Sequence, residues 1–215
     1  MAAWHNLIRA EACKSHVLHQ VETGGVISEV RFQCVRAAAS PPGEGAGAYV
    51  VVGMEMDDVL EVAPAPLVLL TEGLIESFSV DSYWDRVTDA VVGACASPLY
   101  LDLDDQAVMS TFYDYKARTN VNVDVAQSPW VDAFRLGLGV CLDYLRAGRL
   151  DLHRDSLTRK ELRTIEQSTL GDKPEVRWPL VNALRFCLSG FRKYAPTKPF
   201  EPGRYSGSGV KGWMV

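Results

Sequence analysis

The sequence has 215 residues, of which 47% are hydrophobic and 23% are charged, and its net charge is −5. This is the composition of a globular protein long enough to bury its own core, so a small scaffold that depends on disulfides is excluded. No apolar run approaches the roughly 20 residues that a membrane helix needs, and the N-terminal residues carry charges throughout, unlike a signal peptide.

The N-terminal part is predicted to begin with an amphipathic helix over residues 3–21, which Gly24 and Gly25 end. The apolar stripe of this helix is formed by Trp4, Leu7, Ile8, Val17, Leu18 and Val21.

Extended segments are predicted to follow. Residues 26–35 alternate between apolar and polar side chains, the pattern of a half-buried strand. Residues 37–47 read as a flexible loop and residues 48–56 as a second strand, so the two strands are expected to form a hairpin. Residues 63–72 are a third extended candidate, with prolines that suit the entry to a strand.

From residue 81 onward the apolar spacing becomes that of helices. Asp81 or Ser82 is expected to cap the first helix, Asp104 or Asp105 the second, and Ser128 the third. The predicted helices span residues 79–96, 101–120, 128–149, 156–168 and 177–195.

The predicted fold class is therefore α+β and predominantly helical: a small β-rich N-terminal part with one leading helix, followed by a bundle of about five helices. The predicted division is residues 1–80, a helical body over 81–195, and an extended C-terminal arm over 196–215. Residues 1–195 forming one continuous domain is an equally good interpretation, since no linker marks the boundary.

The five cysteines are widely spaced and form no CxxC motif, which favours buried thiols in a reducing, intracellular compartment. They are Cys13, Cys34, Cys95, Cys141 and Cys187. Cys13, His16 and His19 are three residues apart, but this spacing is not the HExxH pattern of a helical zinc site. A surface or half-buried histidine pair is the preferred interpretation, and no metal or cofactor is predicted.

Asp102, Asp104 and Asp105 form an acidic cluster. Such carboxylates hold Mg²⁺ or Mn²⁺ in phosphoester hydrolysis, but aspartates at a helix start also bind its free N–H groups. The segment PPGEGAG lacks the GK[ST] ending of a phosphate loop. Ser189, in CLSGF, lacks a GxSxG elbow and is expected to be a packing residue.

The charge is unevenly distributed along the chain. By count, residues 1–60 carry −3, residues 61–155 carry −8 and residues 156–215 carry +6. Basic residues near the C-terminus alternate with the aromatic residues Tyr194, Phe200, Tyr205 and Trp213, a combination that binds single-stranded nucleic acid. The residues predicted for such contact are Arg185, Arg192, Lys193, Lys198, Arg204 and Lys211.

The last twenty residues are rich in proline and glycine and end in Trp213, Met214 and Val215. Such a segment does not offset its own ordering entropy unless another surface holds it. An arm that grips a neighbouring copy through Phe200, Tyr205, Trp213 and Met214 is the predicted role.

The leading functional hypothesis is thus a non-enzymatic structural subunit that self-associates, as in a viral capsid or coat or a similar particle. Its predicted partners are copies of itself and, within an assembly, nucleic acid, with no membrane. Two alternatives stay open: a metal-dependent hydrolase or nuclease using Asp102 and Asp104, and an adaptor that binds one unlike protein.

Overall fold

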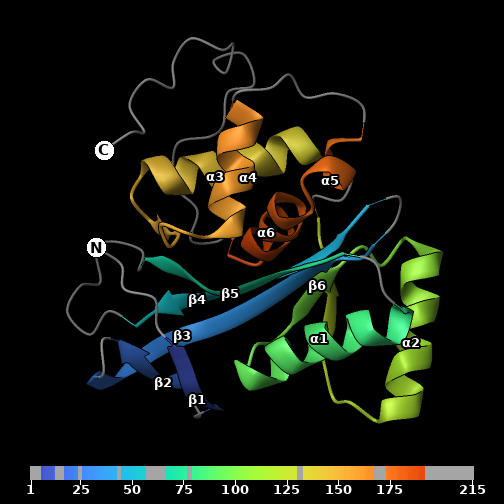
Figure 1. The fold of residues 1–215 in the computed structure, drawn as a ribbon, viewed down its shortest axis with the longest axis horizontal. Coiled ribbons are helices and arrows are strands. Elements are labelled where there is room, and N and C mark those ends of the chain that lie inside the picture. The colour runs from blue at the N-terminus through green and yellow to red at the C-terminus, as the bar shows by residue number, and fades with distance from the viewer. Residues whose placement is uncertain are drawn as a thin grey trace.

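The computed structural model describes residues 6–12, 17–23, 26–42, 45–56, 66–76, 79–129, 133–166 and 173–191. Its centre is a mixed sheet with helices on both faces (Figure 1). The strands are β1 (Asn6–Ala12), β2 (Val17–Thr23), β3 (Val26–Ser40), β4 (Gly47–Glu55), β5 (Leu67–Ile75), β6 (Leu99–Leu101), β7 (Val125–Gln127) and β8 (Leu150–Asp151). The helices are α1 (Val80–Gly93), α2 (Gln106–Thr119), α3 (Phe134–Arg146), α4 (Leu157–Glu166), α5 (Pro174–Arg177) and α6 (Pro179–Ser189).

The sheet is organised around β3, which has 15 residues. Its first part, Val26–Phe32, pairs with β2, and its second part, Phe32–Ser40, pairs with β4, both in antiparallel register. Its second half pairs with β6, which is parallel to it, and β7 in turn is parallel to β6. β5 follows β4 in antiparallel register, and β8 is parallel to β5. The eight strands thus form one sheet, with parallel pairs where chain segments after residue 95 join it.

Two cores lie on opposite faces of this sheet. Alternation along β3 and β4 sends side chains such as Ala38, Val50 and Val52 to the face covered by α3, α4 and α6. Side chains such as Ala37 and Val51 face α1 and α2, where Trp84 and Phe112 pack edge to face with their ring centroids 5.0 Å apart. Figure 1 shows α1 and α2 below the sheet and α3, α4 and α6 above it.

The prediction of a predominantly helical fold is wrong, because the molecule is built on a mixed α/β sheet. The leading helix over residues 3–21 is replaced within the described residues by β1 and β2, which pair with each other and with β3. Residues 37–40, predicted as loop, complete β3. Their small side chains are buried because helices pack on both faces of the sheet at this point.

The predicted hairpin of residues 26–35 and 48–56 is confirmed, as is the third strand, which begins at Leu67. All five predicted helices exist, with shifted starts. Ser79 rather than Asp81 or Ser82 caps α1, and α3 begins at Phe134 rather than beside Ser128. The predicted division into domains stays untested, although strands from both sides of residue 80 share the sheet. None of the helices in the described part of the chain combines the length and apolarity needed to cross a membrane.

Two carboxylates fix the helices of the upper layer. Glu72 of β5 accepts hydrogen bonds from the backbone N–H groups of Leu157 (2.6 Å) and Thr158 (2.9 Å), so it caps α4 from another element. Glu161 of α4 accepts from the N–H of Val181 at 3.0 Å and so caps α6. The spacing of Thr158 and Glu161 is that of a capping box, but none is formed, because Glu161 binds the start of α6 and Glu72 caps α4 instead.

Candidate active site

The carboxyl ends of the parallel strands β3, β6 and β7 meet at one edge of the sheet. Ala38 of β3 pairs with Tyr100 of β6, and Leu101 of β6 pairs with Gln127 of β7. Continuing these registers brings Ser40, Asp102 and Gln127 to the same edge. In open α/β sheets, ligands bind outside the carboxyl ends of parallel strands, especially where the chain leaves neighbouring strands in different directions. This edge is therefore the first place to look for a functional site.

The loop between β6 and α2 carries the three aspartates noted in the sequence. The half-buried Asp102 accepts through Oδ1 from the N–H groups of Asp104 (3.0 Å) and Asp105 (3.3 Å), which folds the loop into a tight turn. Asp105 then caps α2 by accepting from the N–H groups of Ala107 and Val108. The prediction that an aspartate caps this helix is confirmed for Asp105.

Gln127, at the end of β7, holds this loop against the sheet. Its Oε1 accepts from the backbone N–H of Leu103, and its Nε2 donates to Oδ2 of the exposed Asp104 at 3.2 Å. Sequence reasoning missed Gln127, because nothing in its neighbourhood marks a strand of three residues. The register of β7 against β6 is the feature that brings it to the acidic loop.

A buried polar chain approaches the same edge from α6. Asn182 donates through Nδ2 to Oγ of Ser40 at 2.9 Å, and its Oδ1 accepts from Nε of Arg185 at 2.7 Å. The guanidinium carbon of Arg185 lies 4.5 Å from the ring centroid of Phe186 and 5.1 Å from that of Phe134. These contacts fix the end of β3 beneath α6.

The predicted nucleic-acid contact at Arg185 does not fit this geometry. Arg185, which belongs to α6, is 1% exposed, so its guanidinium is buried and does not lie on a surface that a phosphate backbone reaches. Arg185 lies off the apolar spacing of Leu180, Leu184 and Leu188, which suggests an exposed position, but every residue of α6 is buried. The other residues of that prediction and of the predicted arm lie outside the described residues: Arg192, Lys193, Lys198, Phe200, Arg204, Tyr205, Lys211, Trp213 and Met214.

The histidine and serine candidates have structural partners. Nε2 of the buried His19 lies 3.2 Å from the carbonyl oxygen of Ala94, and burial lowers the pKa of the imidazole. Cys13 and His16 lie outside the described residues. Ser189 donates to the carbonyl oxygen of Phe186 at 2.6 Å, as expected of a packing residue within a helix.

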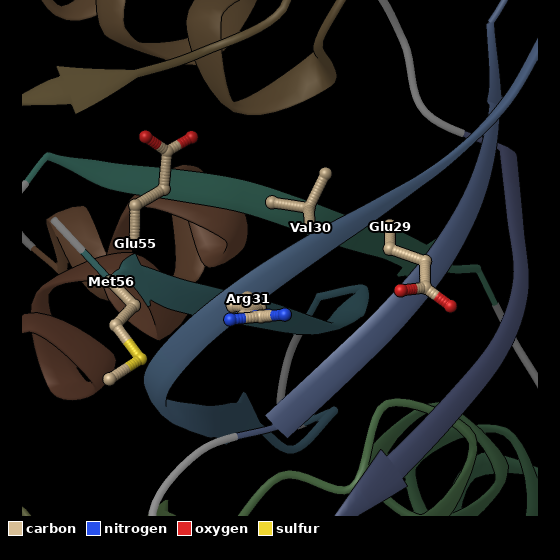
Figure 2. A pocket seen from close by; sticks show the side chains of 5 residues that line it. All are labelled: Glu29, Val30, Arg31, Glu55 and Met56. Carbon is tan, nitrogen blue, oxygen red and sulfur yellow. The ribbon is translucent and has the colours of Figure 1, made fainter. Parts of the chain in front are cut away.

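A second surface feature lies toward the opposite end of β3. An open pocket of about 470 Å³ is lined by Glu29, Val30, Arg31, Glu55 and Met56; Figure 2 shows these five side chains. It sits at the irregularity where β3 and β4 shift register between Phe32 and Cys34. The side chains of Glu29 and Glu55 point away from each other in Figure 2, so they do not form a paired acid and base. The pocket therefore lacks convergent chemistry.

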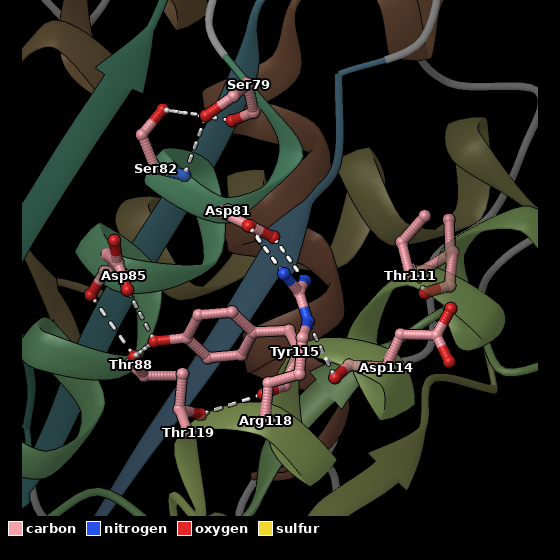
Figure 3. A network of polar contacts seen from close by, with 11 residues as sticks. Ser79, Asp81, Ser82, Asp85, Thr88, Thr111, Asp114, Tyr115, Arg118 and Thr119 are labelled. Carbon is pink, nitrogen blue, oxygen red and sulfur yellow. Dashed lines mark hydrogen bonds and ion pairs between the residues drawn. The ribbon is translucent and has the colours of Figure 1, made fainter.

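A polar network between α1 and α2 is structural (Figure 3). Tyr115 donates to Asp85 at 2.8 Å, and its hydroxyl lies 3.1 Å from that of Thr88. Arg118 forms a bidentate ion pair with Asp81, and this hydrogen bonding lowers the pKa of the Asp81 carboxyl. The network fastens α2 to α1 on the outer side of the lower core.

No protein-family model matches the sequence, and no curated protein matches it. Among solved structures, the chain is similar to the crystal structure of the large terminase nuclease from thermophilic phage G20c. The TM-score is 0.49 at 12% sequence identity, and the match covers 85% of this chain and 92% of that chain.

The prediction of a non-enzymatic capsid or coat subunit is wrong. The helical body on which it depended does not exist as such, because the chain forms a mixed sheet with helices on both faces. The accompanying predictions of self-assembly and of a place in a virion are wrong for the same reason. The predicted partners and the adaptor alternative are not tested by these findings and stay predictions.

Proposed function

We propose that this protein is a divalent-metal-dependent phosphoester hydrolase that uses the carboxylates of Asp102 and Asp104. The observation that supports the proposal is the position of these two side chains. They share one short loop at the carboxyl ends of β6 and its parallel neighbours, and Gln127 braces that loop. The name of the similar phage nuclease agrees with this class of reaction, but the proposal stands on the geometry of this chain alone.

The two carboxylates suit a hard cation. Within the described residues, the hydrogen bonds of Asp102 all go to Oδ1, so Oδ2 has no protein partner there. The exposed Asp104 is oriented by Gln127. Mg²⁺ usually keeps several waters and binds through one or two carboxylates together with substrate phosphates.

The described residues contain no group of three or more His, Cys, Asp or Glu side chains placed to hold a metal. A cation on Asp102 and Asp104 would therefore complete its coordination with water and with the substrate phosphate. Such a cation supplies two effects: it polarises a phosphoryl oxygen, and it lowers the pKa of a bound water. The chain itself contributes the carboxylates and the fixed loop that positions them.

The four described cysteines are free thiols. This supports the intracellular, reducing location that the sequence predicts, since such thiols persist where glutathione and thioredoxin keep them reduced.

The test is hydrolysis of bis(p-nitrophenyl) phosphate and of a DNA duplex with Mg²⁺ or Mn²⁺. The Asp102→Asn/Asp104→Asn variant keeps an acceptor oxygen for the turn and is expected to lose activity by at least about 100-fold, the order of a lost catalytic charge. The matched control is Asp89→Asn/Asp114→Asn, which removes two exposed carboxylates from α1 and α2 and should keep full activity. Metal-independent hydrolysis, or equal activity in the two variants, would overturn the proposal.

A further inference from the structure

The sheet separates two helical layers of opposite charge. Residues 80–127, which supply α1, α2 and their connections, contain eight acidic and three basic residues, a formal charge of −5. Residues 134–191, which supply α3 to α6, contain ten basic and seven acidic residues, a formal charge of +3. The upper layer is thus basic although the whole chain has a negative net charge. Such a separation of charge steers a charged partner to one side of the protein.

Of the seven exposed cations in the described part of the upper layer, four lie on α4 or at the ends of α5. Lys160 and Arg163 lie three residues apart on α4, where such neighbours share a helix face, and both are exposed. Lys173 and Arg177 are exposed at the two ends of α5. The acidic residue between the first pair, Glu161, is turned inward to the N-terminus of α6. α4 and α5 both pack on α6, and α4 contacts the start of α6 at Val181. We call these four cations the α4–α5 basic surface.

This basic surface is tied to the edge that carries Asp102 and Asp104. A Cβ placed on Gly45, in the turn after β3, would lie 3.1 Å from Cγ1 of Val176 in α5, so α5 packs on that turn. Asn182, one turn after α5, bonds to Ser40 at the end of β3. α5 and the N-terminus of α6 therefore lie over the end of β3, which neighbours β6, the strand that leads to Asp102 and Asp104.

The side chains of the surface favour one kind of polyanion. Proteins that bind single strands stack bases on exposed aromatic rings. Among the described residues of α3 to α6, the exposed large apolar side chains are Leu136 and Leu157, and the aromatic side chains, such as Trp178, are buried. The guanidinium carbon of Arg177 lies 4.9 Å from the ring centroid of Trp178, but that ring is buried and does not offer a face to a base. In the described part of these helices the exposed cations are thus not accompanied by exposed aromatic rings, which matches the phosphate backbone of a duplex, bound through charge.

We infer that the α4–α5 basic surface binds the phosphate backbone of a nucleic-acid duplex and presents it to the Asp102–Asp104 edge. This names the substrate class of the proposed hydrolase and so rests on that proposal for its biological meaning. The binding itself needs no metal, because the four cations contact phosphate directly.

The experiment measures the affinity of the full chain for a fluorescent 24-base-pair DNA duplex by anisotropy, in EDTA, over a series of salt concentrations. Lys160→Gln/Arg163→Gln should weaken binding about tenfold, and it should reduce the slope of log K against log salt by about 2, since each phosphate contact contributes about 0.9. Lys173→Gln/Arg177→Gln should act in the same direction. The matched control, Arg86→Gln/Arg118→Gln, removes two cations from α1 and α2 and should leave affinity unchanged.

Two further binding measurements distinguish failure of this inference from failure of the proposed hydrolase function. Asp102→Asn/Asp104→Asn should bind the duplex at least as tightly as wild type, although it has lost hydrolysis. Equal effects of the upper-layer and lower-layer variants, or tighter binding of a single strand of the same length, would overturn the inference. Loss of duplex binding in the aspartate variant would also overturn it, whereas loss of hydrolysis with intact binding concerns the metal site alone.

Discussion

Glu161 links α4 to α6, and its ionisation is predicted to control stability near neutral pH. Burial is the largest effect on this carboxyl and raises its pKa from 4.5 to about 7, although the N–H groups of Val181 and Leu180 oppose the shift. The nearby carboxylate of Glu72 raises the pKa further. The folded state therefore keeps a proton on Glu161 at pH values where the unfolded chain has lost it.

The sign and size of the contribution of Glu161 to the free energy of unfolding follow from this difference in protonation. Between pH 4.5 and about 7 the folded state binds one more proton than the unfolded state, so the contribution of Glu161 to stability falls as pH rises. The rise of the Glu161 pKa from 4.5 to about 7 corresponds to at most about 3 kcal/mol, because solvent screening of this half-buried group reduces the effect. Glu161→Gln keeps the acceptor for Val181 and removes the titration.

The assay is urea unfolding at pH 5, 6, 7 and 8, followed by the fluorescence of the buried Trp84 and Trp178. Wild type and Glu161→Gln should have nearly equal free energies of unfolding at pH 5, and the variant should become the more stable one by pH 8. The control, Glu29→Gln, changes an exposed carboxyl and should follow the wild-type curve. A wild type that gains stability over the variant as pH rises would refute the reasoning.

Three other perturbations have definite expected outcomes. Glu72→Ala should cost roughly 2–3 kcal/mol, since it leaves the N-terminus of α4 without its cap; equal stability to an exposed Glu76→Ala control in urea unfolding would contradict this. Gly137→Ala should destabilise by about 1–3 kcal/mol, because the new Cβ would lie 3.0 Å from the buried Arg185 side chain, and an unchanged Tm would contradict it. Burial raises the pKa of Cys141 to about 12 and that of Cys187 still further, so neither thiol should react with a disulfide reagent at pH 8 until urea is added; fast reaction of all five cysteines would contradict this.

The sequence predicted the strands of the sheet centre because their alternation is strong and long. The error at residues 3–21 arose from a short apolar pattern that suits a helix or two strands. In β2, Val17 and His19 are buried, while Leu18 and Gln20 between them are half-buried. A polar residue therefore occupies an inward position and hides the period of two, which His19 tolerates through its contact with Ala94.

Local propensity also concealed the end of β3. Ala37, Ala38 and Ala39 are weak strand formers, and the prolines after them suggested a loop. Their small size is required by helix packing on both faces, which is a tertiary property. β6, β7 and β8 have two or three residues each, too few for any periodic signal.

The sequence predicted one part of the candidate site, the aspartates, and missed the residues that position them. The aspartates of the loop stand out as a cluster, and the helix start at Asp105 follows from capping rules. The contributions of Gln127, Ser40 and Asn182 come from strand register and helix packing between segments up to 142 residues apart, so no local pattern marks them. The burial of Arg185 was also not predictable from local sequence, because every residue of α6 is buried and the polar positions of this helix do not mark a solvent-facing side.

The most direct test of the central claim is to locate bound Mn²⁺ by NMR. Paramagnetic broadening at substoichiometric Mn²⁺ should appear first at the backbone amides of Leu103 to Ala107 and at the side-chain amide of Gln127, and it should vanish in Asp102→Asn/Asp104→Asn. Broadening centred instead on the pocket at Glu29 and Glu55, or none with Mn²⁺ in excess, would contradict the assignment of the metal site to the carboxyl ends of β3, β6 and β7.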